Sequence, residues 1–116
     1  MKITRIYAGQ DGTSHFEDIE VPFKDFEAAD RRSKVIKATG IIFRETSAAY
    51  DLDYHNAPER QYVITLDGYV DIIAGDGTKH RFGPGDIMLA EDTTGTGHIS
   101  RAVNNKPRKC IFVTLD

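Results

Sequence analysis

The sequence predicts an all-β fold, either a sandwich or a barrel, formed as a single domain over residues 1–116. Short segments in which apolar and polar residues alternate recur along most of the chain. Clusters of Gly, Asp, Asn and Pro separate these segments, as turns between strands do. A length of 116 residues is enough for one hydrophobic core and too short for two ordinary domains.

The alternation places two strands near the start of the chain and a longer series after residue 40. Residues 2–8 and 16–23 form the first two strands, with the turn-rich segment 9–12 between them. Residues 24–33 interrupt the series, because the spacing of Phe23, Phe26 and Ala29 indicates a short helical turn or an irregular loop. The later strands are expected at residues 41–46, 60–66, 69–74, 78–82, 86–90, 98–103 and 109–115.

Three turns follow from residue chemistry. Asp67 and Gly68 separate two apolar segments, and a type I′ turn needs positive φ at both positions, which Asp and Gly tolerate best. This dipeptide is therefore predicted to close a β-hairpin. Residues 75–77, Gly-Asp-Gly, form a second short turn. Pro84 fixes its own φ and donates no backbone hydrogen bond, so residues 83–86 are expected to end one strand and direct the next.

Composition argues against several functions. The net charge of -3 comes from interspersed charges, so neither nucleic acid nor an anionic membrane is an expected partner. No apolar run approaches the roughly 18 to 20 residues of a membrane helix, and the first residues lack the features of a secretory signal. The single cysteine, Cys110, lies in an apolar run and is expected to be a buried thiol in a reducing compartment. We therefore expect a cytoplasmic protein.

Residues 55–101 combine several features in a fixed order. The polar residue Gln61 in a predicted strand is followed seven residues later by Gly68, then by a short hairpin, the segment Gly-Pro-Gly-Asp at 83–86, an apolar strand and His98. This order resembles the cupin superfamily. The resemblance implies a single small jelly-roll barrel, a double-stranded β-helix, and in many family members a metal ion in the barrel mouth.

The metal-binding motif of cupins is only partly kept. With Gly68 as its final glycine, His55 stands where the first histidine belongs, Ala57 where the second belongs, and Gln61 where the glutamate belongs. His98 corresponds to the histidine of the second motif but arrives two residues late. The resemblance therefore implies His55, Gln61 and His98 as ligands if a single divalent transition metal is bound, and otherwise no cofactor.

This ligand set is weak. Two histidines and a neutral carboxamide fall short of the two-histidine, one-carboxylate set that suits non-haem iron. Glu59 restores a carboxylate only if the strand is regular at that point, and Pro58 disfavours such regularity.

Polar residues in and near the predicted strands are candidates for a pocket. His55 and Gln61 have even spacing, so in a regular strand both point to the same side, which the resemblance implies is the barrel interior. Gln61 would then hydrogen-bond a ligand. The alternatives are a turn-capping histidine at 55 and a Gln61 bonded to the backbone. His98 follows a run of small and glycine residues that suits a mobile rim. Because histidine titrates near neutrality, His55 and His98 are candidate catalytic acid and base groups.

Two further residues are candidate ligand-binding groups. Tyr54 is placed to line the mouth of the pocket. Arg44 would clamp a carboxylate or phosphate if it points inward, although an arginine on a half-exposed strand is more often solvated.

These observations lead to three hypotheses about function. The first is a cupin that binds a small polar metabolite without a metal, as an isomerase, epimerase or dehydratase in which His55 and His98 exchange protons. The second is a metal-dependent dioxygenase or lyase that uses His55, His98 and either Gln61 or Glu59. The third is a non-enzymatic module that binds a metabolite. A homodimer is expected, because exposed edge strands are stabilised when a partner covers them.

Overall fold

The computed structural model describes residues 1–116 and consists of strands and turns. It contains no helix that is long and apolar enough to cross a membrane. The all-β class predicted from the sequence is confirmed. The strands are β1 (Lys2–Ala8), β2 (Ser14–Glu20), β3 (Lys24–Glu27), β4 (Asp30–Arg32), β5 (Gly40–Thr46), β6 (Asp51–His55), β7 (Gln61–Asp67), β8 (Val70–Ala74), β9 (Lys79–Phe82), β10 (Ile87–Glu91), β11 (His98–Ala102) and β12 (Arg108–Thr114).

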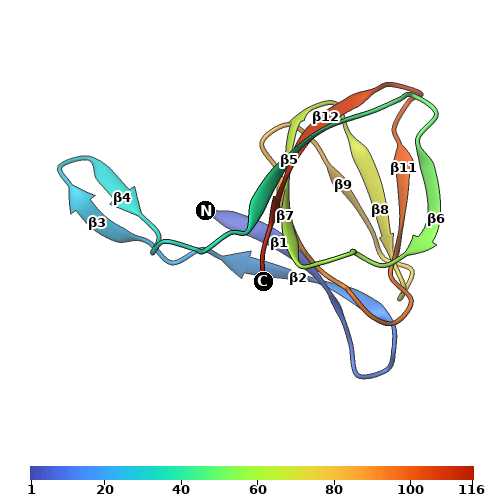
Figure 1. Ribbon diagram of the computed structural model, residues 1–116, viewed down its shortest axis with the longest axis horizontal. Coiled ribbons are helices and arrows are strands. Elements are labelled where there is room, and N and C mark those ends of the chain that lie inside the picture. Colours follow the sequence, from blue (N-terminus) through green and yellow to red (C-terminus); the bar gives the residue numbers. More distant parts are fainter.

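Two sheets face each other and form the body of the molecule (Figure 1). The larger has six strands in the order β2-β1-β10-β7-β12-β5, and the smaller has four in the order β6-β11-β8-β9. The main hydrophobic core lies between the sheets, because both contribute to it. Its buried residues include Ile6, Val63, Met88, Ala90 and Cys110 from the larger sheet and Val70, Ile72, Ala74 and Phe82 from the smaller sheet.

After β5 the chain passes from one sheet to the other at most of its connections. The strands β6, β8, β9 and β11 belong to the smaller sheet, whereas β7, β10 and β12 belong to the larger. Consecutive strands therefore seldom pair with each other. Because side chains alternate between the two faces of a strand, each strand sends one row of residues into the space between the sheets.

The hairpin predicted at Asp67 and Gly68 is wrong. The strand before this dipeptide, β7, pairs with β10 and β12, whereas β8 pairs with β9 and β11. Gly68 has a φ of 78°, but Asp67 is not among the residues with positive φ, so the turn is not of type I′. A Cβ at Gly68 would lie 2.5 Å from the carbonyl oxygen of Pro107, so the turn also needs glycine to approach the start of β12.

The other two predicted turns are present. Residues 75–77 join β8 to β9 as a hairpin, in which the Ala74 amide donates to the Thr78 carbonyl at 2.9 Å. The segment from Gly83 to Asp86 turns the chain toward the larger sheet. The Asp86 carboxylate accepts a hydrogen bond from the Gly83 amide at 2.8 Å and holds this turn in place.

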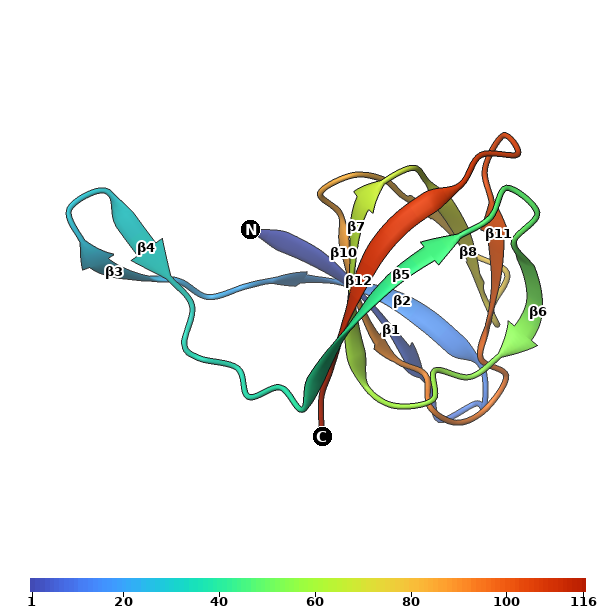
Figure 2. The ribbon, with the colours of Figure 1, turned by 45° about the horizontal axis from the view of Figure 1, so that its top comes forward.

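Residues 24–32 form a β-hairpin, not the helical turn or loop expected at 24–33. Its strands β3 and β4 pair only with each other and project from the body as an arm (Figures 1 and 2). The reversal uses Ala29, which has a φ of 62°, and an alanine does not indicate such a turn in a sequence. Every residue of β3 is exposed, so no apolar alternation marks it as a strand.

Strand β6 was also not predicted from the sequence. Most of its residues are exposed, and it lies at the edge of the smaller sheet, where it pairs with β11. An edge strand with one neighbour has little need for the apolar alternation by which strands are found.

A polar cluster on β2 joins the two sheets. His15 on β2 lies between two carboxylates, with Nε2 3.0 Å from Asp11 and Nδ1 3.0 Å from Asp76 in the β8–β9 turn. The hydrogen bond with Asp11 is the main cause that raises the pKa of His15. The Thr13 backbone amide, followed by the His15 ring, lowers the pKa of Asp11 to about 2. The contact with Asp76 therefore ties the larger sheet to the smaller.

The close approach at Gly68 is tested by comparing two alanine variants. Gly68→Ala and Gly77→Ala both place alanine at a positive φ, but only Gly68 has atoms in the way of a Cβ. We expect Gly77→Ala to lower the free energy of unfolding by about 1 kcal/mol and Gly68→Ala by about 2 to 4 kcal/mol. Urea denaturation measures both, and equal losses would contradict the described packing of Gly68 on β12.

Candidate functional site

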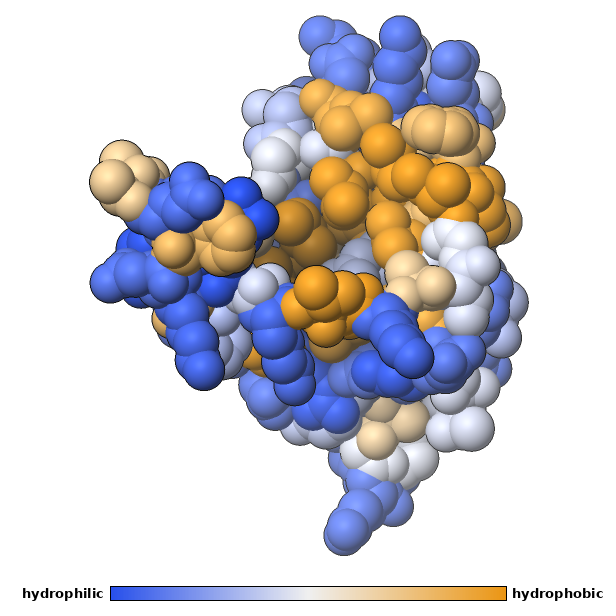
Figure 3. All heavy atoms as spheres, turned by 60° about the vertical axis from the view of Figure 1, so that its left-hand side comes forward, coloured by the Kyte–Doolittle hydropathy of each residue, from blue (hydrophilic) through white to orange (hydrophobic).

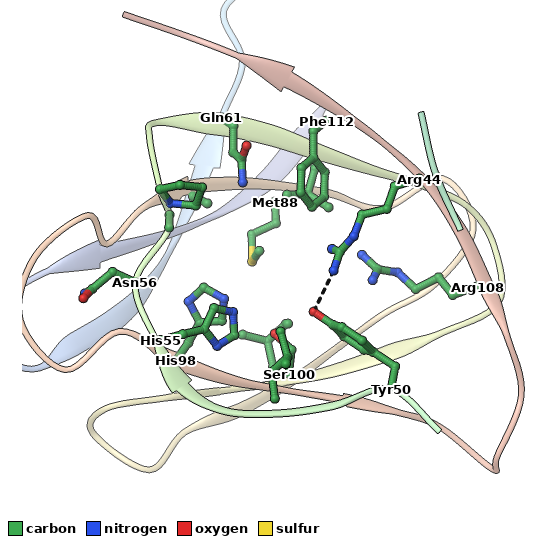
Figure 4. Close-up of a pocket in the computed structure, with 16 residues that line it drawn as sticks. Arg44, Tyr50, His55, Asn56, Gln61, Met88, His98, Ser100, Arg108 and Phe112 are labelled. Atoms are coloured by element: carbon green, nitrogen blue, oxygen red, sulfur yellow. Dashed lines mark hydrogen bonds between the residues drawn. The ribbon is translucent and has the colours of Figure 1, made fainter. Parts of the chain in front are cut away.

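A cavity of about 300 Å³ lies between the two sheets. Figure 4 shows its polar side chains pointing toward a shared interior from strands of both sheets. Arg44, Gln61, Met88 and Arg108 belong to the larger sheet, and His55, His98 and Ser100 to the smaller. The lining residues are Arg44, Tyr50, Leu52, His55, Asn56, Ala57, Pro58, Gln61, Val63, Ile72, Met88, Ala90, His98, Ser100, Arg108 and Phe112.

Two histidines lie together on one side of this cavity. His55 at the end of β6 and His98 at the start of β11 are register partners, and their ring centroids are 4.5 Å apart. Gly97, which has a φ of 69°, permits this arrangement, because any Cβ there would collide with the backbone of His55. The glycine before His98 thus brings the two imidazoles into contact.

Hydrogen bonds fix one nitrogen of each ring. The Nδ1 of His55 lies 2.8 Å from the backbone oxygen of Asp53, which can only accept, so this nitrogen carries the proton. The Nδ1 of His98 bonds to the carboxylate of Asp92, which is fully buried. Neither Nε2 has a partner in the protein. Both imidazoles therefore keep Nε2 for a ligand.

The loop between β10 and β11 is tied down at several points. The Asn56 side chain donates to the backbone oxygens of Asp92 and Gly95 at 3.2 and 3.1 Å, and the Ala57 amide donates to Asp92 at 3.2 Å. The Thr96 amide bonds to the backbone of the β1–β2 turn. These contacts hold the segment before His98 in place, in contrast to the mobile rim expected from its composition.

Two arginines lie on the side of the cavity opposite the histidines (Figure 4). Arg44 on β5 donates from Nη2 to the Tyr50 hydroxyl at 3.1 Å and lies over the Phe112 ring. Arg108, the first residue of β12, is 5% exposed, and its Nε has no hydrogen-bond partner. Burial lowers the pKa of Arg108, but an arginine in a protein remains protonated. This side of the cavity is therefore positively charged.

Two buried polar groups lie between the histidines and the arginines. Gln61 on β7 is 5% exposed and Ser100 on β11 is 3% exposed, and both line the cavity. Because buried polar groups are normally hydrogen-bonded, a ligand that fills the cavity is expected to bond to the Gln61 amide and the Ser100 hydroxyl.

Four of the residues predicted from the sequence are brought together here: His55, His98, Gln61 and Arg44. His55 and Gln61 both line the cavity, but from β6 and β7 in different sheets, so the regular strand on which their even spacing was interpreted is not present. Arg44 points into the cavity, which was one of the two orientations expected for it; the other was toward solvent.

Tyr54 and Glu59 do not line the cavity. Tyr54 is 49% exposed, because it neighbours His55 on β6 and adjacent residues in a strand point to opposite faces. Glu59 is exposed in the bend after Pro58, before β7 begins at Gln61. The strand alternation used to place Glu59 therefore does not apply to it.

Two residues of the site, Asp92 and Arg108, were not predicted from the sequence. Asp92 begins a Thr- and Gly-rich loop, where an aspartate is an ordinary turn residue. Arg108 belongs to the basic segment Lys106-Pro107-Arg108-Lys109, which looks like a solvated turn. Alternation from the buried Cys110, two residues later, is the one sequence feature that indicates an inward Arg108.

The donor set does not suit a tightly bound transition metal. No group of three or more His, Cys, Asp or Glu side chains is placed to hold one ion. Asp92 is bonded to His98, and Glu59 lies outside the cavity, so only the amide of Gln61 accompanies the two imidazoles. A stable site usually needs a better third donor.

Comparison with known proteins identifies the fold but no family. No protein-family model and no curated protein matches the sequence. The conserved protein SPY1581 of unknown function from Streptococcus pyogenes has a similar structure, with 17% identity, a TM-score of 0.53, and 72% of this chain and 69% of that chain covered. Protein NMB1881 from Neisseria meningitidis is similar at 14% identity and a TM-score of 0.52, with 72% and 81% covered. At these identities the likeness shows the fold alone.

The contact between Asp92 and His98 predicts a defined tautomer that nitrogen NMR detects. At about pH 8, where an ordinary histidine is neutral, we expect His98 to carry its proton on Nδ1. In Asp92→Leu no acceptor faces Nδ1, so the proton is no longer held there and the Nε2 tautomer becomes populated. Asp53→Asn is the control, because His55 bonds to the backbone of Asp53. An unchanged His98 tautomer in Asp92→Leu would contradict the hydrogen bond.

Proposed function

We propose that this protein is a metal-independent enzyme of the cupin type, an isomerase, epimerase or dehydratase, that acts on a small polar metabolite in the cavity between its sheets. One observation carries the proposal: His55 and His98 are in contact, each has Nδ1 bonded to a protein acceptor, and each keeps Nε2 free. A side chain positioned in this way transfers protons to and from a bound molecule.

The hydrogen-bond partners suggest a role for each ring. A carboxylate that accepts from Nδ1 orients an imidazole and stabilises the imidazolium formed when Nε2 takes a proton, so Asp92 supports His98 as the acid. Nδ1 of His55 donates to a neutral carbonyl, which leaves a lone pair on Nε2 for a base.

In an isomerase the base removes a proton from a substrate carbon or hydroxyl and the acid gives one to the neighbouring atom, whereas in an epimerase the acid gives it to the opposite face of the same carbon. In a dehydratase the base removes the carbon proton and the acid protonates the neighbouring hydroxyl, whose C–O bond breaks to release water. Each cycle leaves the base protonated and the acid deprotonated, and exchange with solvent restores them, so no oxidant is needed.

The topology supports the cupin-type jelly roll within this proposal. In a jelly roll the chain alternates between two facing sheets and seldom pairs consecutive strands, as it does here after β5. A cavity with its polar groups between the sheets is where members of such folds bind ligands.

A non-enzymatic metabolite-binding module is the second candidate. The positive side of the cavity favours it, since binding an anion there needs neither histidine. The metal-dependent dioxygenase or lyase has weaker support because of the incomplete donor set.

Proton exchange from solvent deuterium into a panel of small hydroxy and keto metabolites tests the enzymatic proposal. We expect wild-type protein to label one of them, and His55→Gln and His98→Gln to lower the rate ~100-fold or more, as for loss of an acid or base. His80→Gln is the matched control, because His80 stacks on Phe82 and does not line the cavity. Equal rates in all three variants would refute the proposal. A melting temperature that rises on adding Fe, Mn, Ni or Zn would favour the metal-dependent alternative.

We also propose that the protein is a homodimer. Strand β5 is an edge of the larger sheet, and its Phe43 and Ile41 are 76% and 56% exposed. The arm and the segment after it add Phe26 at 56% and Val35 at 91%. Seen from the side that carries the arm, apolar side chains gather in a patch (Figure 3). A second copy of the chain would cover both the patch and the free edge of β5.

Sedimentation velocity at micromolar concentration measures this association. We expect a dimer for the wild type and a monomer for Phe43→Lys, because a charge on β5 opposes burial of that edge. Leu66→Lys is the control, since Leu66 is 53% exposed but lies on β7, away from the edge. A wild-type monomer would overturn the proposal.

A further inference from the structure

The arginines of the cavity differ from all others in the chain. Every other arginine forms an ion pair with an aspartate or glutamate: Arg5, Arg31, Arg32, Arg60, Arg81 and Arg101. Arg44 has only the neutral hydroxyl of Tyr50, and the side chain of Arg108 forms neither an ion pair nor a hydrogen bond. The arginines outside the cavity are thus neutralised, while the two that line it are not.

This distribution is the reverse of what stability alone favours. A charge removed from water is costly unless it is paired, whereas an exposed charge needs no partner. Arg108 is 5% exposed, so without a ligand its guanidinium is removed from water and no protein counter-charge offsets the desolvation. The missing counter-charge is therefore expected from a bound molecule.

The two guanidinium groups are arranged to act together. Arg44 pairs in register with Cys110, and Arg108 precedes Cys110 by two residues on the neighbouring strand β12. Both side chains therefore leave adjacent strands on the same face. Tyr50 and Phe112 support Arg44, so a second charge stands beside that of Arg108.

We infer that Arg44 and Arg108 together bind the oxyanion group, carboxylate or phosphate, of a small metabolite whose remaining atoms extend toward His55 and His98. Planar guanidinium groups bind such oxygens through paired hydrogen bonds. The volume of about 300 Å³ lies at the lower end for ligand pockets, which favours a small metabolite. This inference deepens the proposed function by naming the class of its substrate.

Matched ligands isolate the contribution of the anion. Glycerol 3-phosphate is compared with glycerol, and lactate with 1,2-propanediol, so each pair differs in the charged group. At about 10 mM we expect at least one anion to raise the melting temperature by ~3 °C or more, with no shift from the neutral partners. A shift from only one anion decides between phosphate and carboxylate. Equal behaviour of anions and neutral partners would overturn the inference.

Arginine variants locate the binding. Arg108→Met and Arg44→Met are expected to abolish the anion-dependent shift, whereas Arg101→Met, on the exposed and ion-paired Arg101, keeps it. Without ligand, Arg108→Met should melt at or above the wild-type temperature, because an unpaired buried charge has been removed. This shows that lost binding is not lost folding. A shift that persists in Arg108→Met would place the anion elsewhere and refute the inference.

The same variants separate this inference from the proposed chemistry. His80→Gln, outside the cavity, should still show the anion-dependent shift. If the wild type binds the anion but exchanges no substrate proton, the enzymatic proposal fails and the arginine site stands. If it exchanges protons of a neutral metabolite and binds no anion, the arginine site fails and the enzymatic proposal stands.

Discussion

The passage of the chain back and forth between two facing sheets is the constraint on which the rest of the structure depends. Each crossing turns another row of alternating side chains into the same interior. Residues as distant in sequence as Arg44, His98 and Arg108 therefore line one cavity. The crossings need close backbone contacts, and Gly68 and Gly97 permit them because a side chain at either position would strike neighbouring backbone.

The interior has an apolar part and a polar part with different roles. Residues such as Val70, Ile72 and Phe82 fill the first and stabilise the sheets through burial. The second contains the buried carboxylate of Asp92, which bonds to His98, and the unpaired guanidinium of Arg108. Neither group improves packing. A local departure from the rules of stability is characteristic of functional sites. The proton-transferring side and the anion-binding side face each other across the cavity (Figure 4).

Local sequence indicated where the chain turns but not which sheet the next strand joins. Gly75–Gly77 and Asp67–Gly68 have similar turn chemistry, yet the first closes a hairpin and the second sends the chain across to the other sheet. Pairing depends on residues far along the chain, so neighbouring residues do not determine it. The arm was missed for a related reason, since β3 is wholly exposed and has no apolar alternation.

The site was predicted in part for the same physical reasons. His55 and Gln61 both line the cavity, as predicted, but they do so from β6 and β7 in different sheets, so the single regular strand assumed for their even spacing is not present. Arg108 and Asp92 lie at the start of a strand and in a loop, where composition resembles that of any solvated turn. Their roles appear only when β12 pairs with β5 and the loop closes on His98.

A crystal structure with glycerol 3-phosphate or lactate bound tests the central claim most directly, since it shows both sides of the cavity at once. The account predicts oxyanion oxygens within about 3 Å of the Arg44 and Arg108 guanidinium groups, with the rest of the ligand toward Nε2 of His55 and His98. A ligand bound outside the cavity, or an Arg108 paired with a protein carboxylate or turned out to solvent, would contradict it.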